Sequence, residues 1–274
     1  VVLFGLFLRG GLLIPWMDHF SSSWELLTVT GISTAVIFPA AVFLSRRLLL
    51  DNGKGGVDWN VFGGLLIGYN VMLRLVYLGN VELLQEEAYY WNYSQHLAPG
   101  YLDHPPMVAL LIHLGTLLFG SNELGVRFGS FLCWFITAFF VYRTTWRLFD
   151  KQAAFRALIL TAVLPIFFGT AFVITPDTAL IACWAGSLYF LHRALIDQHS
   201  GSWYVAGLFL GFGLVSKYTI AFLGPAVLLF LLVDPSSRKW LIRPQPYLAA
   251  VIALVIFSPV IWWNYQHDWA SFLF

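Results

Sequence analysis

Charged residues are scarce in this chain, and their scarcity excludes an ordinary soluble domain. Only 11% of the 274 residues are charged, whereas soluble globular domains carry about 25%. Hydrophobic residues make up 59% of the sequence and aromatic residues 18%, and the mean hydropathy is +0.76. The formal net charge is +1 and no stripe of basic residues is present, so nothing points to nucleic-acid binding. The composition is that of an integral membrane protein.

Cysteine is also scarce, which excludes a framework of disulfides. The two cysteines, Cys133 and Cys183, both lie inside apolar runs. We therefore expect buried thiols that behave as small apolar side chains, not a disulfide or a metal site with cysteine ligands. Four histidines likewise lack the spacing of metal ligands: His96, His113, His192 and His199.

What the sequence does contain is a series of apolar runs of about 20 residues, the length that a bilayer-spanning helix needs. We predict an all-α polytopic membrane protein with about nine spanning helices, near residues 1–18, 24–45, 60–79, 125–147, 153–175, 177–197, 202–217, 219–234 and 246–264. A further run at residues 107–119 would span only about 20 Å as a helix, short of the roughly 30 Å hydrocarbon core. We expect this run to be a helix at the membrane interface.

Lysine and arginine fall mostly on alternate loops of this map. One side holds 11 of the 15 basic residues, which is the pattern of cytoplasmic loops. Arg127 and Lys217 fall on the opposite side, where acidic residues gather instead. If residues 107–119 were a span, the basic cluster at residues 143–156 would move to the outside. The charges therefore place the polar interval at residues 85–107, hereafter the acidic loop, on the extracytoplasmic face of the plasma (inner) membrane.

The acidic loop is the one long interval where carboxylates, aromatic residues, histidines and paired prolines occur together. Glu86 and Glu87 precede an aromatic run, and Asp103 and His104 precede two prolines. Prolines cannot continue a helix from upstream, and they hold the residue before them in an extended conformation. Asp103 and His104 would therefore lie at the mouth of a helix that begins at Met107.

The acidic loop resembles the first external loop of the GT-C glycosyltransferases that use polyprenyl-phosphate sugars, the group of the protein O-mannosyltransferases and the lipid A aminoarabinose transferases. That family carries an acidic pair before an Ala-Tyr-Tyr-Trp-like run, and then Gly-Tyr-x-Asp-His-Pro-Pro. Here the blocks read Glu-Glu-Ala-Tyr-Tyr-Trp at residues 86–91 and Gly-Tyr-Leu-Asp-His-Pro-Pro at residues 100–106. The departure is Glu86, where the commoner family residue is aspartate.

The resemblance implies a GT-C-like fold and the transfer of a sugar, with inversion, from a polyprenyl phosphate to an extracytoplasmic acceptor: lipid A, protein or another glycan. By this resemblance Glu86 would be the general base. Glu87 and Asp103 would position the acceptor, or a divalent cation if the enzyme uses one; no other cofactor is implied. His104 would stabilise the leaving phosphate. No nucleotide-sugar site is implied, in agreement with the lack of a glycine-rich phosphate loop.

Ionisable groups at membrane depth mark a functional site by default, and three more lie at the outer ends of predicted helices: Asp177, Lys217 and His267. Asp177 also fits a helix cap or a first-turn acid. Lys217 resembles the family's Ser/Thr-Lys pair, which suits a lipid-borne phosphate, but it also fits an interfacial lysine that snorkels. His267, beside three tryptophans, and the pair Tyr89 and Tyr90 fit either a sugar-binding surface or an interfacial aromatic belt.

The predicted organisation has three parts. Residues 1–50 form a transmembrane hairpin that resembles the end of a GtrA-like module, residues 51–59 a cytoplasmic hinge, and residues 60–274 a GT-C-like domain. The sequence has no initiator Met and stops abruptly, so we expect a longer native chain. The competing function is a transporter or flippase for a lipid-linked sugar, and a third is a structural membrane subunit. Carriers tend to place their charges near the midplane, whereas here the charges cluster at one face.

Overall fold

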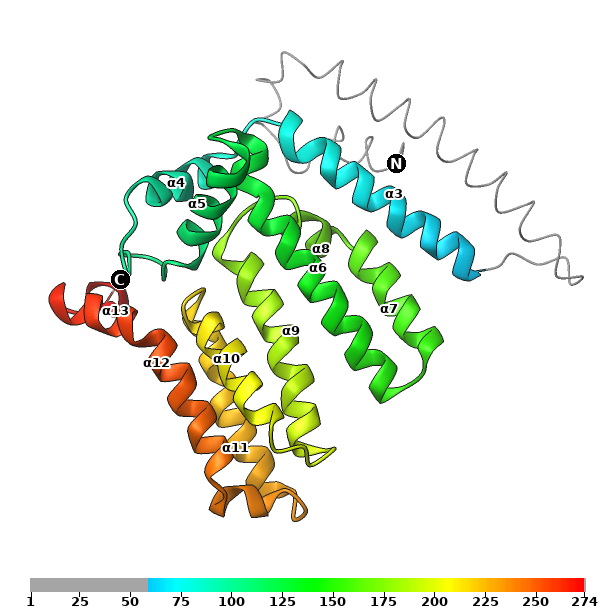
Figure 1. Cartoon of the computed structure of the whole chain (residues 1–274), viewed down its shortest axis with the longest axis vertical. Coiled ribbons are helices and arrows are strands. Elements are labelled where there is room, and N and C mark those ends of the chain that lie inside the picture. Colours follow the sequence, from blue (N-terminus) through cyan, green and yellow to red (C-terminus); the bar gives the residue numbers. More distant parts are fainter. Residues whose placement is uncertain (1–58, 274) are drawn as a thin grey trace, which may run out of the picture. The chain divides into compact units, whose positions relative to one another are not determined.

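The structure is a computed structural model that describes residues 59–273, and every regular element in that range is a helix (Figure 1). The chain divides into two compact units, residues 1–73 and residues 74–274. Helix α3 (Trp59–Asn80) crosses the boundary between them. The helices predicted near residues 1–18 and 24–45, the hairpin at 1–50 and the hinge up to residue 58 lie outside the described residues.

The helices that follow α3 match most of the predicted apolar runs. They are α4 (Gln85–Gln95), α5 (Met107–Phe119), α6 (Glu123–Leu148), α7 (Lys151–Val163), α8 (Pro165–Thr170), α9 (Pro176–Leu195), α10 (Ser202–Leu214), η3 (Tyr218–Phe222), α11 (Leu223–Val233), η4 (Arg238–Ile242), α12 (Pro244–Gln266) and α13 (Ala270–Leu273). Side-chain caps fix two of the starts: Asn122 accepts from the Gly125 amide before α6, and Asp150 accepts from the Ala153 amide before α7.

Three of the described helices are long and apolar enough to cross a membrane: Asn60–Leu78 within α3, α6 and α12. The apolar helices α5 and α10 and the segment Tyr218–Val233 are shorter. The prediction of one helix over residues 153–175 is wrong. The chain leaves helical geometry at Leu164, where φ is −65° and ψ is 132°, because the residue before a proline avoids the α conformation. Helices α7 and α8 replace the single span.

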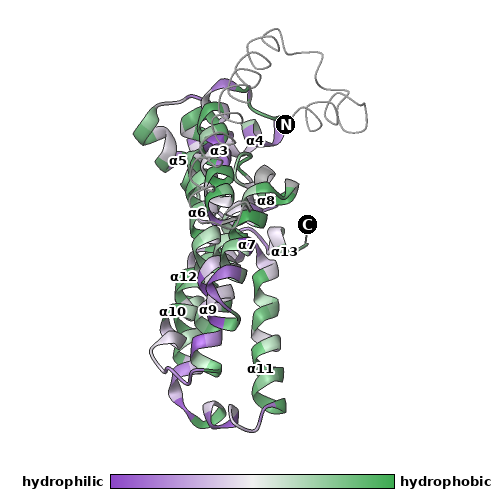
Figure 2. Cartoon of the chain, turned by 90° about the vertical axis from the view of Figure 1, so that its right-hand side faces the viewer, coloured by the Kyte–Doolittle hydropathy of each residue, from purple (hydrophilic) through white to green (hydrophobic). Residues whose placement is uncertain are grey.

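Within the second unit, α12, α10, α9, α6 and α7 form a row in which each helix packs against the next (Figure 1). Helix α5 packs on α6, and α4 packs on α5. Both lie at one end of the long axes of these helices, hereafter the end of the row where α4 and α5 lie. The links from α6 to α7, from α9 to α10 and from α11 to α12 lie at the opposite end. Figure 2 shows that α11 is apolar along its length and that hydrophilic residues gather in the link that follows it.

Small residues allow the helices of the row to approach closely. A Cβ added to Gly207 of α10 would lie 2.5 Å from the carbonyl oxygen of Ala249 in α12. At the end of the row where α4 and α5 lie, a buried cluster joins α4, α5, α6 and the link before α9. Its residues are Tyr90, Val108, Ile112, Val126 and Ile174. Both cysteines are free and buried, as expected. The packing therefore anchors α4 firmly to the helices beside it.

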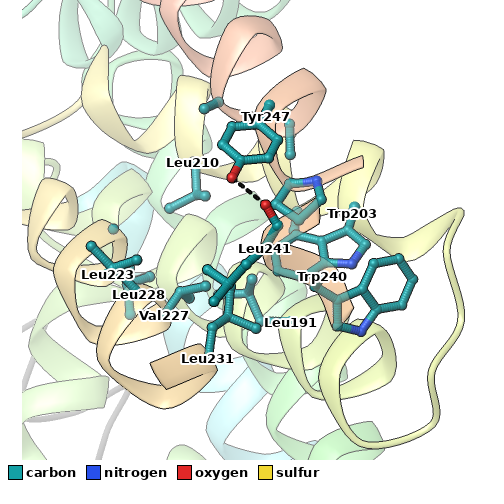
Figure 3. Close-up of a pocket in the computed structure, with 15 residues that line it drawn as sticks. Leu191, Trp203, Leu210, Leu223, Val227, Leu228, Leu231, Trp240, Leu241 and Tyr247 are labelled. Carbon is teal, nitrogen blue, oxygen red and sulfur yellow. Dashed lines mark hydrogen bonds between the residues drawn. The ribbon is translucent and has the colours of Figure 1, made fainter. Parts of the chain in front are cut away.

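An apolar pocket of about 210 Å³ lies toward the end of the row opposite α4 and α5, among α9, α10, α11, η4 and α12 (Figure 3). Its most prominent rings are those of Trp203, Trp240 and Tyr247, and the Tyr247 hydroxyl donates to the Leu241 carbonyl at 2.5 Å. No carboxylate, histidine or cation lines this pocket. Its composition suits apolar contacts and not acid–base chemistry.

Candidate active site

Three segments that are far apart in the sequence meet at the end of the row where α4 and α5 lie. The Met107 amide donates to the Val215 carbonyl at 3.0 Å. The Ser216 hydroxyl donates to the Pro176 carbonyl at 2.6 Å. These two hydrogen bonds fix the start of α5, the start of α9 and the turn after α10 side by side. Each segment carries ionisable residues that the sequence singled out.

Lys217 and Asp177 form an ion pair at this junction. The Lys217 Nζ lies 2.8 and 3.0 Å from the two carboxylate oxygens of Asp177. The side chains are 33% and 46% exposed, respectively. The N-cap of α9 is Thr175, and Asp177 lies in the first turn of the helix. Asp177 is therefore not a helix cap, and its structural alternative is that of a first-turn acid. Because both groups are partly open to solvent, an incoming anion can reach the Lys217 cation.

Asp103 is held by two neighbours within the acidic loop. The Tyr93 hydroxyl donates to Oδ1 at 2.6 Å, and the His104 Nδ1 lies 3.1 Å from Oδ2 without the geometry of a hydrogen bond. Burial alone would raise the pKa of Asp103, but the Tyr93 hydrogen bond and the nearby His104 outweigh burial and lower it. Asp103 is therefore an anion at neutral pH.

Tyr90 of α4 is buried beside His104. Its ring meets that of His104 edge-on, with 5.8 Å between the centroids. Burial raises the pKa of Tyr90, and the negative charges of Glu86, Asp103 and Asp177 raise it further. The Tyr90 hydroxyl therefore stays protonated at neutral pH. The exposed Tyr89 bonds through its hydroxyl to Tyr93.

Glu86 and Glu87 are adjacent in α4 but lie in opposite environments. Glu86 is exposed, and its carboxylate has no hydrogen bond or ion pair among the residues that the structure describes. Glu87 is 0% exposed. Its carboxylate accepts from Arg127 Nε at 2.9 Å and Nη2 at 2.6 Å, and from the amides of Leu84 at 3.0 Å and Ile174 at 3.2 Å. Only Glu86 of the pair is open to a substrate.

The predicted roles of Glu87 therefore need correction. A carboxylate that already accepts four hydrogen bonds in a buried position cannot also bind an acceptor substrate. It does not fit a cation shared with Asp103 either, and within residues 59–273 no group of three or more His, Cys, Asp or Glu residues has metal-ligand geometry. Sequence reasoning missed the partner of Glu87. The available signal was Arg127, a cation on the side of the map where acids gather.

His267 lies on the same end of the row but is held by its own helix terminus. Its ring stacks on Trp263 with 4.1 Å between the centroids, and its Nδ1 lies 2.7 Å from the Trp263 carbonyl oxygen. Trp263 in turn faces Gly100 of the acidic loop, where an added Cβ would lie 2.9 Å from the indole ring. The structure thus brings His267 toward the acidic loop through Trp263, and a belt role and a substrate role both remain open.

Comparison with known proteins identifies the group to which this arrangement belongs. The profile of the dolichyl-phosphate-mannose-protein mannosyltransferase family matches residues 103–263, which is more than half of the chain. The chain belongs to this family. The matched range begins at Asp103 and includes Asp177 and Lys217. The family that the sequence motifs predicted is thereby confirmed for the chain, and the matched range covers the end of the acidic loop from Asp103 onward.

Several curated relatives are named as sugar transferases, three of them as acting on lipid A or the lipopolysaccharide core. A lipid A galacturonosyltransferase, RgtD, of Rhizobium johnstonii is 31% identical over 75% of this chain and 44% of its own length. A lipopolysaccharide core galacturonosyltransferase, RgtB, of the same organism is 29% identical over 78% of this chain and 44% of its own length. An undecaprenyl phosphate-alpha-4-amino-4-deoxy-L-arabinose arabinosyl transferase of Sodalis glossinidius is 28% identical over 50% of this chain and 25% of its own length. The chain thus spans less than half the length of these relatives. No solved structure matches it.

Proposed function

We propose that this chain is part of a membrane glycosyltransferase that moves a sugar from a polyprenyl-phosphate donor to lipid A or another part of lipopolysaccharide. The observation that carries the proposal is the ion pair of Lys217 and Asp177, which the hydrogen bonds of Met107 and Ser216 hold beside the start of α5 and the end of the acidic loop, in a chain of this family. The names of the relatives support lipopolysaccharide as the acceptor and a uronic acid or aminoarabinose as the sugar. A protein acceptor has less support from these names.

The residues suit a single displacement at the anomeric carbon. Glu86 would accept the proton of the acceptor hydroxyl, whose oxygen forms the new bond to the anomeric carbon. The bond from that carbon to the phosphate oxygen breaks, and the leaving phosphate keeps the electron pair. Lys217 and His104 would stabilise the added negative charge, and such preorganised electrostatics commonly contributes several kcal/mol. Attack opposite the leaving group inverts the anomeric centre.

We also propose that the acidic loop faces the extracytoplasmic side and that the chain spans the membrane about nine times. Several described basic residues belong to the helix ends and links opposite α4 and α5: Arg143, Arg147, Lys151, Arg156, Arg193, Arg238, Lys239 and Arg243. The two cations on the acidic side are both paired, Arg127 with Glu87 and Lys217 with Asp177. The exceptions to the positive-inside pattern are thus neutralised by their partners.

Family membership favours a transferase over the transporter alternative, and the test is a transfer assay with the full-length protein in proteoliposomes. The donor would be undecaprenyl phosphate carrying galacturonic acid or aminoarabinose, and the acceptor lipid A. Glu86→Gln keeps the size of the side chain but removes the base, so kcat should fall by about 10² to 10⁴. Glu86→Asp restores the commoner family residue and should remain active. Glu82→Gln, at an exposed carboxylate before α4, is the matched control and should leave the rate unchanged.

Three outcomes distinguish the parts of the proposal. If Glu86→Gln keeps its rate while Asp103→Asn or Asp177→Asn abolishes transfer, the base must be reassigned to that residue. If none of the three substitutions matters, the transferase proposal fails. If transfer occurs with one donor sugar and not the other, mass spectrometry of the lipid A product identifies the sugar class.

A further inference from the structure

The buried ion pair of Glu87 and Arg127 joins four separate segments of the chain. Glu87 belongs to α4 and Arg127 to α6. Arg127 also donates from Nη1 to the Val81 carbonyl at 2.6 Å and from Nη2 to the Glu82 carbonyl at 2.8 Å, in the link that leads into α4. The fourth segment is the link before α9, whose Ile174 amide donates to Glu87 at 3.2 Å. One pair of charges thus holds four backbone segments together.

Stability alone does not explain this pair. Removing two charges from water carries a desolvation cost that can exceed their mutual attraction, and apolar residues of similar volume often fill such sites as well or better. Arg127 and Glu87 are both 0% exposed, and the guanidinium also lies 4.5 Å from the centroid of the Phe172 ring. What the charges add is direction, because a guanidinium binds a carboxylate in a fixed planar geometry.

The pair is linked to both sides of the proposed site through short stretches of the chain. Glu86, the proposed base, precedes Glu87, so the placement of Glu87 sets the side of α4 from which Glu86 projects. Asp177 follows Ile174 by three residues, so the bond from the Ile174 amide sets where α9 begins relative to α4. Neither Glu87 nor Arg127 is open to substrate, so both act through these neighbours.

We propose that Glu87 and Arg127 are positioning residues that aim Glu86 at the acceptor and hold it at its distance from Asp177 and Lys217. This inference rests on the proposed function, in which Glu86 is the base. The pair makes no contact with the reacting atoms. Its loss should therefore lower kcat through misplacement of the base and should leave KM for the lipid donor nearly unchanged.

A double-substitution cycle between the neighbours Glu86 and Glu87 tests this inference in the full-length protein. Glu87→Gln keeps the shape of the side chain but removes its charge. In the otherwise native protein it should lower kcat by up to about 10²-fold, the penalty of a misplacement on the order of 1 Å. A Glu86→Gln protein has no base left to misplace. Adding Glu87→Gln to it should therefore lower kcat by less than about twofold below the kcat of Glu86→Gln alone. Rates are normalised to the folded fraction measured by size-exclusion chromatography.

A purely structural pair gives a different pattern. If Glu87→Gln lowers kcat by the same factor in both backgrounds, or raises donor KM as much as it lowers kcat, the positioning role is wrong. If Glu86→Gln alone does not slow transfer, the base assignment of the proposed function fails first and this inference falls with it. Should Glu87→Gln not fold, Arg127→Lys, which keeps the charge but loses the bidentate geometry, completes the same cycle.

A matched control is Arg74→Gln. Arg74 is a second fully buried arginine, whose Nη2 donates to the Ala162 carbonyl of α7 at 3.0 Å and whose guanidinium lies 4.2 Å from the Trp134 ring centroid of α6. Its substitution should lower stability but leave the kcat of the folded fraction within about twofold. A loss of kcat equal to that of Glu87→Gln would show that any buried arginine has this effect, and would overturn the inference.

Discussion

Lys217 carries the charge that the proposed reaction needs at the donor phosphate, and Asp177 binds that charge in the structure. A bound phosphate would compete with Asp177 for the same ammonium. Lys217→Ala should weaken donor binding as well as turnover, because the phosphate is present in both the ground state and the transition state. A hydrogen bond to a charged group is worth about 1.5–3 kcal/mol, so kcat/KM should fall about 10- to 150-fold. Steady-state kinetics with varied lipid donor would measure this.

Asp177→Asn is the informative partner of that substitution. It removes the competing carboxylate and frees Lys217, so KM for the donor should stay the same or fall. If Lys217→Ala has no effect while Asp177→Asn abolishes transfer, the functional member of the pair is Asp177, and Lys217 serves only as its counter-ion.

Tyr93 sets the protonation of Asp103, which makes a pH prediction possible. Tyr93→Phe removes the hydrogen bond to Oδ1, so the pKa of Asp103 should rise from its lowered value toward or above the ordinary one. A carboxylate with a depressed folded-state pKa contributes stability above its unfolded pKa, and that contribution is lost as the pH falls through the folded pKa. The acid unfolding midpoint and the acid limb of kcat/KM should both move to higher pH.

The matched control for this pH shift is Tyr89→Phe. The Tyr89 hydroxyl contacts the Tyr93 hydroxyl but not Asp103, so its removal leaves the bond from Tyr93 to Asp103 in place. Profiles measured between about pH 3 and 7 bracket the titration of an ordinary carboxyl. Equal shifts in the two variants would contradict the assignment of the effect to the bond between Tyr93 and Asp103.

At the residue scale, the sequence could predict which residues gather but not which of them face substrate. Asp177 and Lys217 were both singled out, and the structure joins them in one pair. The resemblance gave Glu86 and Glu87 different roles, but their different environments could not be predicted, because the burial of Glu87 depends on Arg127, 40 positions further along. Two adjacent residues of a helix differ by about 100° in direction, so one carboxylate can be buried while the next is open. Only the tertiary partner decides which.

At the scale of elements, the approach of α10 to α12 depends on Gly207. An added Cβ would meet the Ala249 backbone, which cannot move aside as a flexible side chain can. Gly207→Ala should therefore force the helices apart and destabilise the protein by about 1–3 kcal/mol, the usual cost of overpacking. Thermal unfolding of the purified protein in detergent, followed by circular dichroism, would measure this as a lower midpoint.

Gly224 of α11 supplies the matched control, because an added Cβ there would have no atom within 4 Å. Alanine restricts the unfolded chain more than glycine does, so Gly224→Ala should be neutral or stabilise by about 0.4–1 kcal/mol. If both substitutions lower the unfolding midpoint equally, close packing of α10 against α12 is not the cause.

The elements themselves were predictable to different degrees. The bounds of α5 coincide with the predicted apolar run at residues 107–119, because the two prolines before it and Gly120 after it punctuate the sequence. The break between α7 and α8 was missed although a proline marks it. A hydropathy window responds to side-chain polarity, whereas the break arises from the backbone of Leu164. Apolar composition predicted where helices lie better than where they stop.

At the scale of the whole molecule, charge carried more of the prediction than hydropathy did. Length and composition support three of the predicted spans among residues 59–273. The alternation of basic and acidic links predicted that each helix runs in the direction opposite to the one before it. Within residues 74–273, consecutive helices from α6 to α12 that are joined by these links do run in opposite directions. Short helices such as α10 pack between longer neighbours, so they need not be long or strongly apolar themselves. The number of spans therefore remains a prediction.

The orientation of the molecule can be tested with single cysteines at its two ends. Gln95 closes α4 in the acidic loop, and Ser236 lies in the link between α11 and α12; both are exposed. The native Cys133 and Cys183 are only 5% and 8% exposed, so their background labelling should be low. In intact cells with a permeabilised outer membrane, an impermeant thiol reagent should label Gln95→Cys and not Ser236→Cys, and lysed cells should label both. Labelling of Ser236→Cys alone in intact cells would invert the topology, and it would place Glu86 and Lys217 on the cytoplasmic face, away from an extracytoplasmic acceptor.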